Sequence, residues 1–296
     1  MIEMSRKAAL SIDVEDWFHS ENVKGVVPRE AWDLCESRVA RNTERMLKIL
    51  QDSGARATFF VLGWVAERFP GLVPAIAAAG HEVASHGYGH ELVYRMSPAA
   101  FAADVERSRK LIEDQSGQAV RGYRAPCFSI TDWAVDVLQE AGYAYDSSMV
   151  PALAHDRYGR LEAVDVRTPI VQLREGFHEV CVSCLQIGGR GVPWGGGGYF
   201  RLLPYALWLR GVAAIQKTGK PYIFYIHPWE IDPGHPVPAG MGAVNRFRQT
   251  VGLSGSEARF AAIASEVEWN TVGGILGSWI AQQTTHEAPR LAAGMN

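Results

Sequence analysis

Short apolar runs alternate with longer amphipathic stretches through the first half of the chain. The apolar runs predict buried strands, and they lie at 8–12, 57–62, 81–84, 120–123 and 143–145. Between them, residues such as Val39, Met46 and Leu50 recur at helical spacing within 28–53, and Gly54 ends that pattern. Ser97 and Pro98 predict the start of a second helix that ends near Gln115. Strand and helix therefore alternate, which favours a parallel sheet or barrel.

The pattern changes after about residue 161. Segments 164–168 and 180–185 read as strands with no helix between them, and a glycine-rich segment follows at 193–201. The remaining chain predicts a helix at 205–216, a strand at 221–226, helical structure at 245–269 and a tail from 284. We predict an α/β fold: a single distorted (β/α) barrel over 8–240, a helical extension over 241–283, a leader over 1–7 and a flexible tail over 284–296.

Composition agrees with this fold and excludes some partners. The chain has 296 residues, 47% of them apolar and 21% charged, whereas a β/α barrel typically has roughly 250 residues. The net charge is −3 with no long basic run, so nucleic acid is not an expected partner. We expect no membrane span, because no stretch of about 18 apolar residues exists. The first seven residues contain no signal-peptide segment, and the four cysteines form no evident disulfide framework, so we predict a cytoplasmic protein.

Residues that can do chemistry follow several of the predicted strands. Asp13, Glu15 and Asp16 follow the first strand, His86 and His90 the third, Arg124 the fourth, and His227 the strand at 221–226. In β/α barrels, active sites are built at the carboxyl ends of the strands. Two histidines four residues apart can bind one metal ion together with a carboxylate. Taken alone, the histidine pair fits solvated loop residues, the acids fit helix caps or solvated loop residues, and His227 fits a structural residue, so the prediction depends on all of them occurring together.

The order of these clusters resembles the polysaccharide deacetylases of carbohydrate esterase family four, the NodB homology domain. His86-Gly87-Tyr88-Gly89-His90 stands in the place of the metal motif of this family, Arg124-Ala125-Pro126 matches its Arg-x-Pro motif, and Ile226-His227 matches its late histidine. The acid cluster at 13–19, the glycine-rich segment through Arg201 and His227-Pro228-Trp229-Glu230 look like the subfamily associated with exosortase-A, or PEP-CTERM, exopolysaccharide loci.

The resemblance implies a metal-dependent hydrolase that removes N-acetyl groups from amino sugars of a bacterial exopolysaccharide or its precursor. A divalent metal, zinc or otherwise cobalt, nickel or iron, would be held by His86, His90 and a carboxylate. Asp13 would be the base, Arg124 would keep it ionised, and His227 would protonate the leaving amine. The backbone N–H of Cys127, which follows Pro126, would stabilise the oxyanion. Tyr199 and Trp229 are candidate substrate contacts, and Trp17 and Trp194 are further aromatic residues that suit sugar faces or a core.

Three departures from the family pattern leave alternatives open. Val14 follows Asp13, so the third metal ligand is either Glu15 or Asp16. Gly87 replaces the usual hydroxyl residue, for which Ser85 is a substitute. The usual Asp-Trp partner of the acid histidine is missing, and Asp146 is the leading candidate for that role. These departures keep a non-catalytic module that binds polysaccharide in view. A second alternative is a hydrolase of small non-sugar amides, since some barrel relatives act in this way, as allantoinase-like proteins do.

Overall fold

The computed structural model describes residues 8–152, 158–165 and 168–293, with side chains described as far as Thr284. The strands are β1 (Ala8–Val14), β2 (Thr58–Val61), β3 (Glu82–Ser85), β4 (Gly122–Tyr123), β5 (Tyr145–Asp146), β6 (Ile170–Arg174), β7 (Phe177–Val180), β8 (Cys184–Ile187), β9 (Arg190–Pro193), β10 (Tyr222–Ile226) and β11 (Trp269–Asn270). The helices are α1 (Val39–Ser53), α2 (Gly63–Arg68), α3 (Leu72–Ala78), α4 (Pro98–Ser116), α5 (Asp132–Glu140), α6 (Gly197–Leu202), α7 (Tyr205–Gln216), α8 (Ala243–Thr250), α9 (Ser256–Glu266) and α10 (Val272–Ala293). Short 3₁₀ turns occupy Trp17–His19, Arg29–Leu34, Val93–Arg95, Pro126–Phe128, Pro228–Ile231 and Leu253–Gly255.

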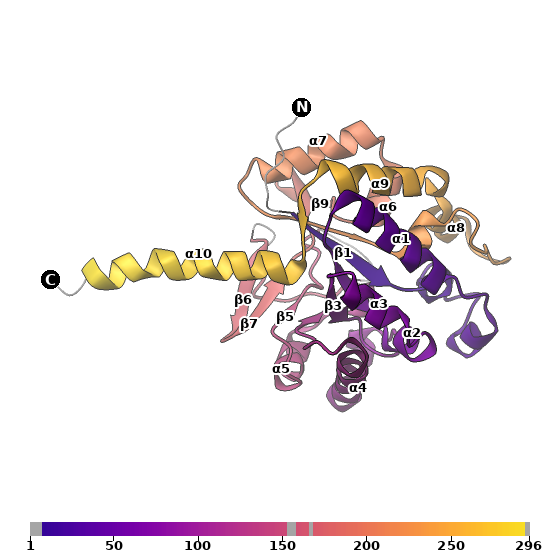
Figure 1. Ribbon diagram of the computed structural model, residues 1–296, viewed down its shortest axis with the longest axis horizontal. Coiled ribbons are helices and arrows are strands. Elements are labelled where there is room, and N and C mark those ends of the chain that lie inside the picture. The colour runs from indigo at the N-terminus through magenta and orange to yellow at the C-terminus, as the bar shows by residue number, and fades with distance from the viewer. Residues whose placement is uncertain (1–7, 153–157, 166–167, 294–296) are drawn as a thin grey trace.

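The main sheet is a curled half-barrel in the order β10-β1-β2-β3-β4-β5-β7-β6, with β11 pairing to β1. Neighbouring strands run parallel from β10 to β7, and only β6 pairs antiparallel to its neighbour within this described sheet. Most helices cover the outside of this curl, as Figure 1 shows. The predicted distorted β/α barrel is confirmed.

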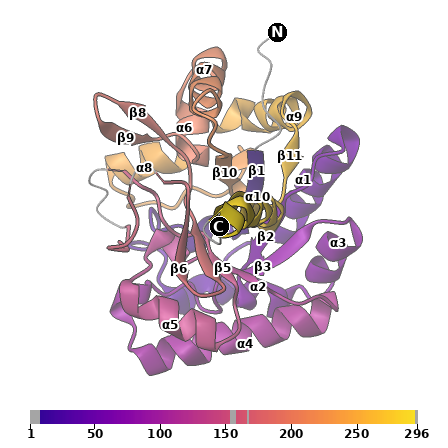
Figure 2. The same cartoon turned by 90° about the vertical axis from the view of Figure 1, so that its left-hand side faces the viewer.

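The two faces of β1 explain how the sheet separates core from site. Leu10 and Ile12 belong to the main apolar core, whereas Ala9 belongs to a second cluster with residues of α10 such as Ile275. Side chains alternate along a strand, so Asp13 shares the face of Ala9. The start of α10 therefore closes the amino end of the curl, where Figure 2 shows this helix end-on among the strands. The carboxyl end is left for polar residues.

Local sequence signals account for most helix boundaries. The hydroxyl of Ser97 accepts a hydrogen bond from the N–H of Ala100, Pro98 occupies the first helical position of α4, and Gly117 ends the helix with a φ of +66°. The predicted helix over 28–53 is divided, because α1 begins only at Val39. The carboxylate of Asp16 accepts hydrogen bonds from the N–H groups of Arg38 and Val39 and so caps α1 from outside the helix.

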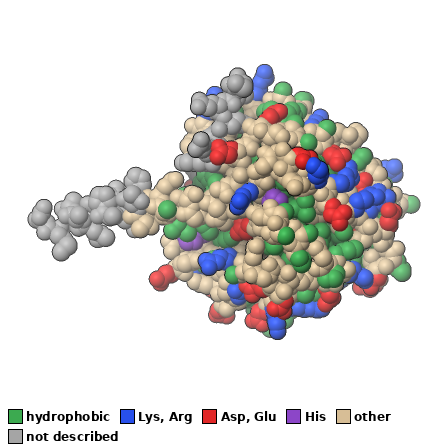
Figure 3. All heavy atoms as spheres, in the orientation of Figure 1, with side chains coloured by type: hydrophobic (Ala, Val, Ile, Leu, Met, Phe, Trp, Pro, Cys, Tyr) green, Lys and Arg blue, Asp and Glu red, His purple; other side chains and the backbone are tan. Residues whose placement is uncertain are grey.

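The second half of the chain departs further from prediction. The described residues of segment 164–168 lie outside any strand, while residues 166–167 fall outside the described part. The predicted strand 180–185 is split between β7 and β8. Helix α10 continues beyond residue 284 to Ala293 and projects from the body in Figure 1. Figure 3 shows acidic and basic side chains mixed over the face in view. No helix in the described part of the chain is long and apolar enough to cross a membrane.

Candidate active site

Glu15, His86 and His90 form a buried cluster at the carboxyl ends of β1 and β3. Oε1 of Glu15 lies 2.7 Å from Nε2 of His86 and 2.9 Å from Nε2 of His90. Burial alone would raise the pKa of Glu15, but His90, His227 and the hydrogen bonds from both cluster histidines lower it well below its usual range. The carboxylate is therefore ionised, and the three side chains offer one oxygen and two nitrogens within 4.8 Å of one another. A set of two histidines and a carboxylate is a common ligand set for a catalytic divalent metal.

The hydrogen bond on the far side of His86 tests whether a metal fits. Nδ1 of His86 lies 2.8 Å from the carbonyl oxygen of Arg124, which can only accept a hydrogen bond. Nδ1 therefore carries the proton, and in a neutral ring the lone pair of Nε2 faces the ionised Glu15. Two electron-rich atoms at 2.7 Å require a cation or an added proton between them. This orientation of a histidine by a backbone carbonyl is typical of metal ligands, and so the donor set fits a divalent metal.

Asp13 is held beside this cluster by Arg124. One guanidinium nitrogen of Arg124 donates to Oδ1 of Asp13 at 2.6 Å and to the hydroxyl of Ser11 at 2.8 Å. The other nitrogens donate to the carbonyl and hydroxyl oxygens of Ser147 at 2.8 and 2.9 Å. Both Asp13 and Arg124 are almost completely buried. The ion pair orients one carboxylate oxygen toward Arg124 and leaves the other, Oδ2, 3.9 Å from Nε2 of His227.

His227 is the centre of a second chain of charged groups. Its Nδ1 lies 2.7 Å from Oε1 of Glu230, whose other oxygen accepts a hydrogen bond from Arg201 at 2.6 Å. Burial would raise the pKa of Glu230, but Arg201 and His227 lower it to about 2. Burial would likewise lower the pKa of His227, but the carboxylates of Glu15, Glu230 and Asp13 raise it to about 9. His227 is therefore protonated at neutral pH, with Nε2 directed toward Asp13.

The glycine-rich segment provides the space for this second chain. A Cβ atom at Gly197 would lie 2.2 Å from Oε1 of Glu230, which is closer than any side chain allows. The absence of a side chain at Gly197 therefore lets the Glu230 carboxylate approach the backbone closely. Residues 197–202 are helical rather than a flexible loop, so α6 delivers Arg201 to Glu230 from a regular element.

A carboxylate on α4 stabilises the loop between His86 and His90. Asp104 accepts hydrogen bonds from the N–H groups of Tyr88 at 2.7 Å and Gly89 at 3.1 Å. Gly87 has a φ of +71°, and a Cβ atom there would lie 2.9 Å from Asp104. Ser85, the predicted substitute for the missing hydroxyl, accepts a longer hydrogen bond of 3.2 Å from the N–H of Gly87. Asp104 and Ser85 therefore share the role.

Strained backbone is concentrated at this site. Among the described residues, the non-glycine positions with positive φ are His90, Cys127 and Phe128. Such conformations cost on the order of 1–3 kcal/mol each and persist where the surroundings fix them. Pro126 lies buried below this turn and its carbonyl accepts a hydrogen bond from the hydroxyl of Ser129, whereas Cys127 and Phe128 line the cavity. The turn therefore holds the backbone of Cys127 at the edge of the cavity.

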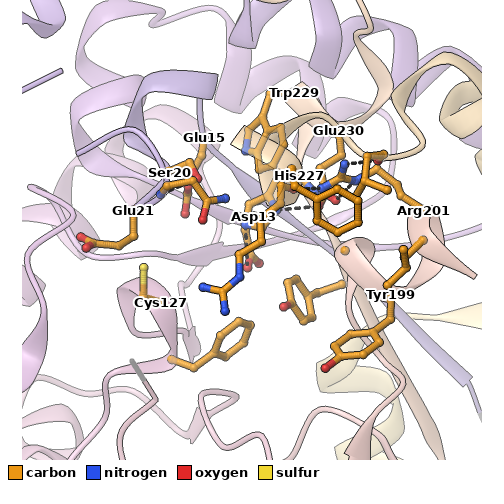
Figure 4. Close-up of a pocket in the computed structure, with 18 of the residues that line it drawn as sticks. Asp13, Glu15, Ser20, Glu21, Cys127, Tyr199, Arg201, His227, Trp229 and Glu230 are labelled. Atoms are coloured by element: carbon orange, nitrogen blue, oxygen red, sulfur yellow. Dashed lines mark hydrogen bonds and ion pairs between the residues drawn. The ribbon is translucent and has the colours of Figure 1, made fainter. Parts of the chain in front are cut away.

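These groups open into one cavity of about 760 Å³, drawn in Figure 4. Asp13, Glu15, His86 and His227 line its floor, and both Tyr199 and Trp229 contribute to its walls. The indole of Trp229 is nearly buried and stacks on the His227 ring at 5.4 Å between centroids. Trp229 therefore positions the histidine more than it offers a surface. The Trp17 and Trp194 indoles donate to backbone carbonyls, and both side chains lie buried in apolar clusters.

Two candidate residues are corrected by this geometry. Asp16 does not approach the histidines, because its carboxylate is used by Ser37, Arg38 and Val39 at the start of α1. Glu15 is therefore the carboxylate of the cluster. Asp146 does not contact His227, since it accepts a hydrogen bond from Ser148 at 2.5 Å and pairs with Glu179 on the neighbouring strand. Glu230 takes the place beside His227 that was predicted for Asp146.

Three residues of the site had no predicted role. Glu230 follows His227 by three residues, and on the 3₁₀ turn Pro228–Ile231 this spacing returns its carboxylate to the histidine. That spacing is visible in the sequence and could have identified it. Arg201 ends the glycine-rich motif, and this position is only a weak sequence signal for a role in the site. Asp104 lies inside an amphipathic helix, and nothing local to it in the sequence indicates its contact with the histidine loop.

Comparison with known proteins divides the chain into two matched regions. Residues 31–145 match the polysaccharide deacetylase family, and residues 147–277 match a domain of unknown function, DUF3473. Over 111 residues the chain is 35% identical to a peptidoglycan deacetylase of Helicobacter pylori. The aligned segment covers 36% of this chain and 36% of that one. Over 103 residues it is 35% identical to a chitooligosaccharide deacetylase of a Bradyrhizobium species, covering 34% of this chain and 46% of that one.

These matches span less than half the length of either curated relative. A solved structure from Mycobacterium smegmatis, described as a candidate polysaccharide deacetylase, has the same fold. It aligns with a TM-score of 0.62 at 18% identity and covers 95% of this chain and 92% of that one. Residues 31–145 are thus similar to polysaccharide deacetylases, and residues 147–277 match the domain of unknown function.

Proposed function

We propose that this protein is a metal-dependent N-deacetylase that hydrolyses N-acetyl groups of amino sugars. The observation that carries this proposal is the convergence of three groups on one cavity: the Glu15–His86–His90 cluster, the Asp13–Arg124 pair and the His227–Glu230 pair. Glu15, His86 and His90 would hold the metal, most simply zinc. When bound, such a cation supplies a Lewis acid that polarises a carbonyl and lowers the pKa of water.

The protein residues then divide the proton transfers. Asp13 would accept a proton from the attacking water, whose oxygen forms a bond to the acetyl carbon. Arg124 pairs with Asp13 at 2.6 Å and holds its carboxylate in place. The N–H of Cys127 would donate to the oxyanion, which develops on the former carbonyl oxygen. His227 would give the proton on Nε2 to the amide nitrogen as the carbon–nitrogen bond breaks, leaving a free amine and acetate.

The substrate is proposed by similarity and by the shape of the site. One curated relative is named as a peptidoglycan deacetylase and the other as a chitooligosaccharide deacetylase. The motifs that resemble the exosortase-associated subfamily favour a bacterial exopolysaccharide or its precursor. The cytoplasmic location, the boundary near residue 240 and the identity of the metal remain predictions.

Acetate release tests this proposal. The purified full chain, loaded with zinc, should release acetate from N-acetylated oligosaccharides, and a chelator should abolish the activity until metal is restored. Asp13→Asn should lower the rate by about 10³-fold or more, because it removes the base. Since Asp13→Asn also leaves Arg124 without its charge partner, thermal unfolding checks the fold of that variant. A metal-binding, folded wild-type protein that releases no acetate from any N-acetylated glycan would refute the proposal.

A further inference from the structure

One wall of the cavity is apolar and is built by the C-terminal half of the chain. Leu202 of α6, Val244 and Phe247 of α8 and Val251 just after α8 all line the cavity. We call these four residues the apolar wall. Val244, Phe247 and Val251 are separated by three and four residues, so they form one stripe along the helix. Relative exposures of 64% for Val244, 54% for Phe247 and 47% for Leu202 show that no described part of the protein covers the wall.

Helix α8 is held with a polar side chain buried and apolar side chains exposed. Its polar Gln249 is completely buried and its amide donates to the carbonyl of Trp17, whereas its apolar Val244 and Phe247 face outward. Arg201 donates to the carbonyl oxygens of Arg248 and Val251, which ties the end of α8 to the chain of charged groups behind His227. The apolar side chains are therefore held outward by a buried polar anchor. Large exposed apolar patches of this kind mark binding surfaces.

Another part of the cavity lining, which we call the polar wall, has a different chemistry. Ser20 and Glu21 line it, and Figure 4 shows them across the cavity from Tyr199 and Arg201, whereas the nearby Asn22 donates its side-chain amide to Gln249 of α8. The hydroxyl of Ser20 and the carboxylate of Glu21 can pair with sugar hydroxyls, whereas the side chains of the apolar wall offer no hydrogen-bonding atom. A second sugar against the apolar wall would leave its hydroxyl groups unpaired, which is costly. A hydrocarbon group would be favoured there.

We propose that the apolar wall binds a hydrocarbon group attached to the N-acetylated sugar, so that the substrate is an amphiphilic saccharide. This inference rests on the proposed function and specifies its substrate class. The apolar wall, Asp13 and His227 line the same cavity, so one molecule can place an acetamide beside Asp13 and a hydrocarbon group on the wall. The sugar would contact the polar wall, and the hydrocarbon would extend along α8.

Two pairs of glycosides test the proposal on the zinc-loaded full chain. Calorimetry compares octyl β-glucoside with methyl β-glucoside, which carry no acetyl group and so report binding alone. Acetate release compares octyl and methyl β-glycosides of N-acetylglucosamine. We expect the octyl compounds to bind about tenfold more tightly and to react with about tenfold higher kcat/KM. The double variant V244S/F247S should reduce both preferences to about twofold. Leu34→Ser, which changes an exposed leucine outside the cavity lining, is the control and should retain them.

Several results would overturn the inference. Equal binding of octyl and methyl glucoside would do so, as would an octyl preference that survives in V244S/F247S. Loss of chitooligosaccharide binding in that variant, with no octyl preference in the wild type, would make the wall a sugar subsite. A change of oligomeric state or loss of phospholipid-vesicle binding in the variant, again without an octyl preference, would assign the wall to a second copy or to a membrane. Octyl glucoside binding without acetate release from any compound would instead refute the proposed function.

Discussion

The site has two buried clusters of ionisable groups, which differ in how their charges are paired. We call Glu15, His86 and His90 the metal side, and Arg201, His227 and Glu230 the acid side. On the acid side, the carboxylate of Glu230 lies between a guanidinium and a protonated imidazole. On the metal side, one carboxylate faces two imidazole nitrogens, and the hydrogen bond of His86 to the Arg124 carbonyl turns a lone pair toward it. The acid side contains its own cations, whereas the metal side needs either an added proton or an added cation between the Glu15 carboxylate and the histidine nitrogens.

The two sides also come from different parts of the chain. The residues of the metal side follow directly after β1 and in the loop after β3, and the two histidines fall within the match to the polysaccharide deacetylases. The acid side lies wholly within the match to the domain of unknown function. We infer that this second region completes the catalytic machinery by holding a proton donor, while the first holds the metal.

Loss of a metal ligand should have the largest effect. His86→Gln removes a ligand nitrogen, and we expect zinc affinity to fall by about 10²-fold or more and acetate release by about 10³-fold or more. Zinc titration followed by calorimetry measures the first quantity. Unchanged zinc affinity in this variant would show that the metal side is wrongly assigned.

Loss of the acid should separate the two sides. His227→Gln removes the proton donor, and we expect kcat to fall by about 10²- to 10⁴-fold, as is usual for loss of a general acid. Zinc affinity should stay within about threefold of the wild type, because His227 is not one of the three ligands. A large loss of zinc affinity in this variant would show that His227 also binds the metal, so that the two sides form one metal site.

Two adjacent glycines provide a smaller, matched test of the acid side. Gly197→Ala places a methyl group 2.2 Å from the Glu230 carboxylate, so we expect a loss of about 1–3 kcal/mol in unfolding free energy and about tenfold in kcat. At Gly198 a Cβ atom meets nothing within 4 Å, and Gly198→Ala should preserve or slightly raise stability, since alanine favours the helix. Thermal unfolding compares the stabilities of the two variants. An equal loss of stability in both would show that the predicted clash with Glu230 is wrong.

The sequence predicted those parts of the site that depend on order along strands. The positions of Asp13, His86, Arg124 and His227 after their strands follow from the rule that parallel strands present their carboxyl ends at one edge. The choice between Glu15 and Asp16 could not be predicted, because it depends on α1, whose first N–H groups bind Asp16. The contact of Arg201 with Glu230 depends on the packing of α6, which no local pattern reveals.

The fold shows the same division. Helix α4 was predicted almost to the residue, because a serine cap, a proline and a terminal glycine mark its ends. Segments 164–168 and 180–185 were predicted less well, because β-propensity does not specify where a strand finds its partner. The inward position of α10, which closes the curl, depends on tertiary packing of an apolar stripe at its start.

The pH dependence of kcat in Glu230→Gln, compared with Asp146→Asn, tests the central claim most directly. Both variants neutralise a buried carboxylate, but only Glu230 contacts His227. The Glu230 carboxylate helps to raise the pKa of His227 to about 9, so its loss must lower that pKa and make activity decline at lower pH on the alkaline side. The account predicts this shift, of about one pH unit or more, for Glu230→Gln and an unchanged alkaline limb for Asp146→Asn. An unchanged limb in Glu230→Gln, or the same shift in both variants, would contradict it.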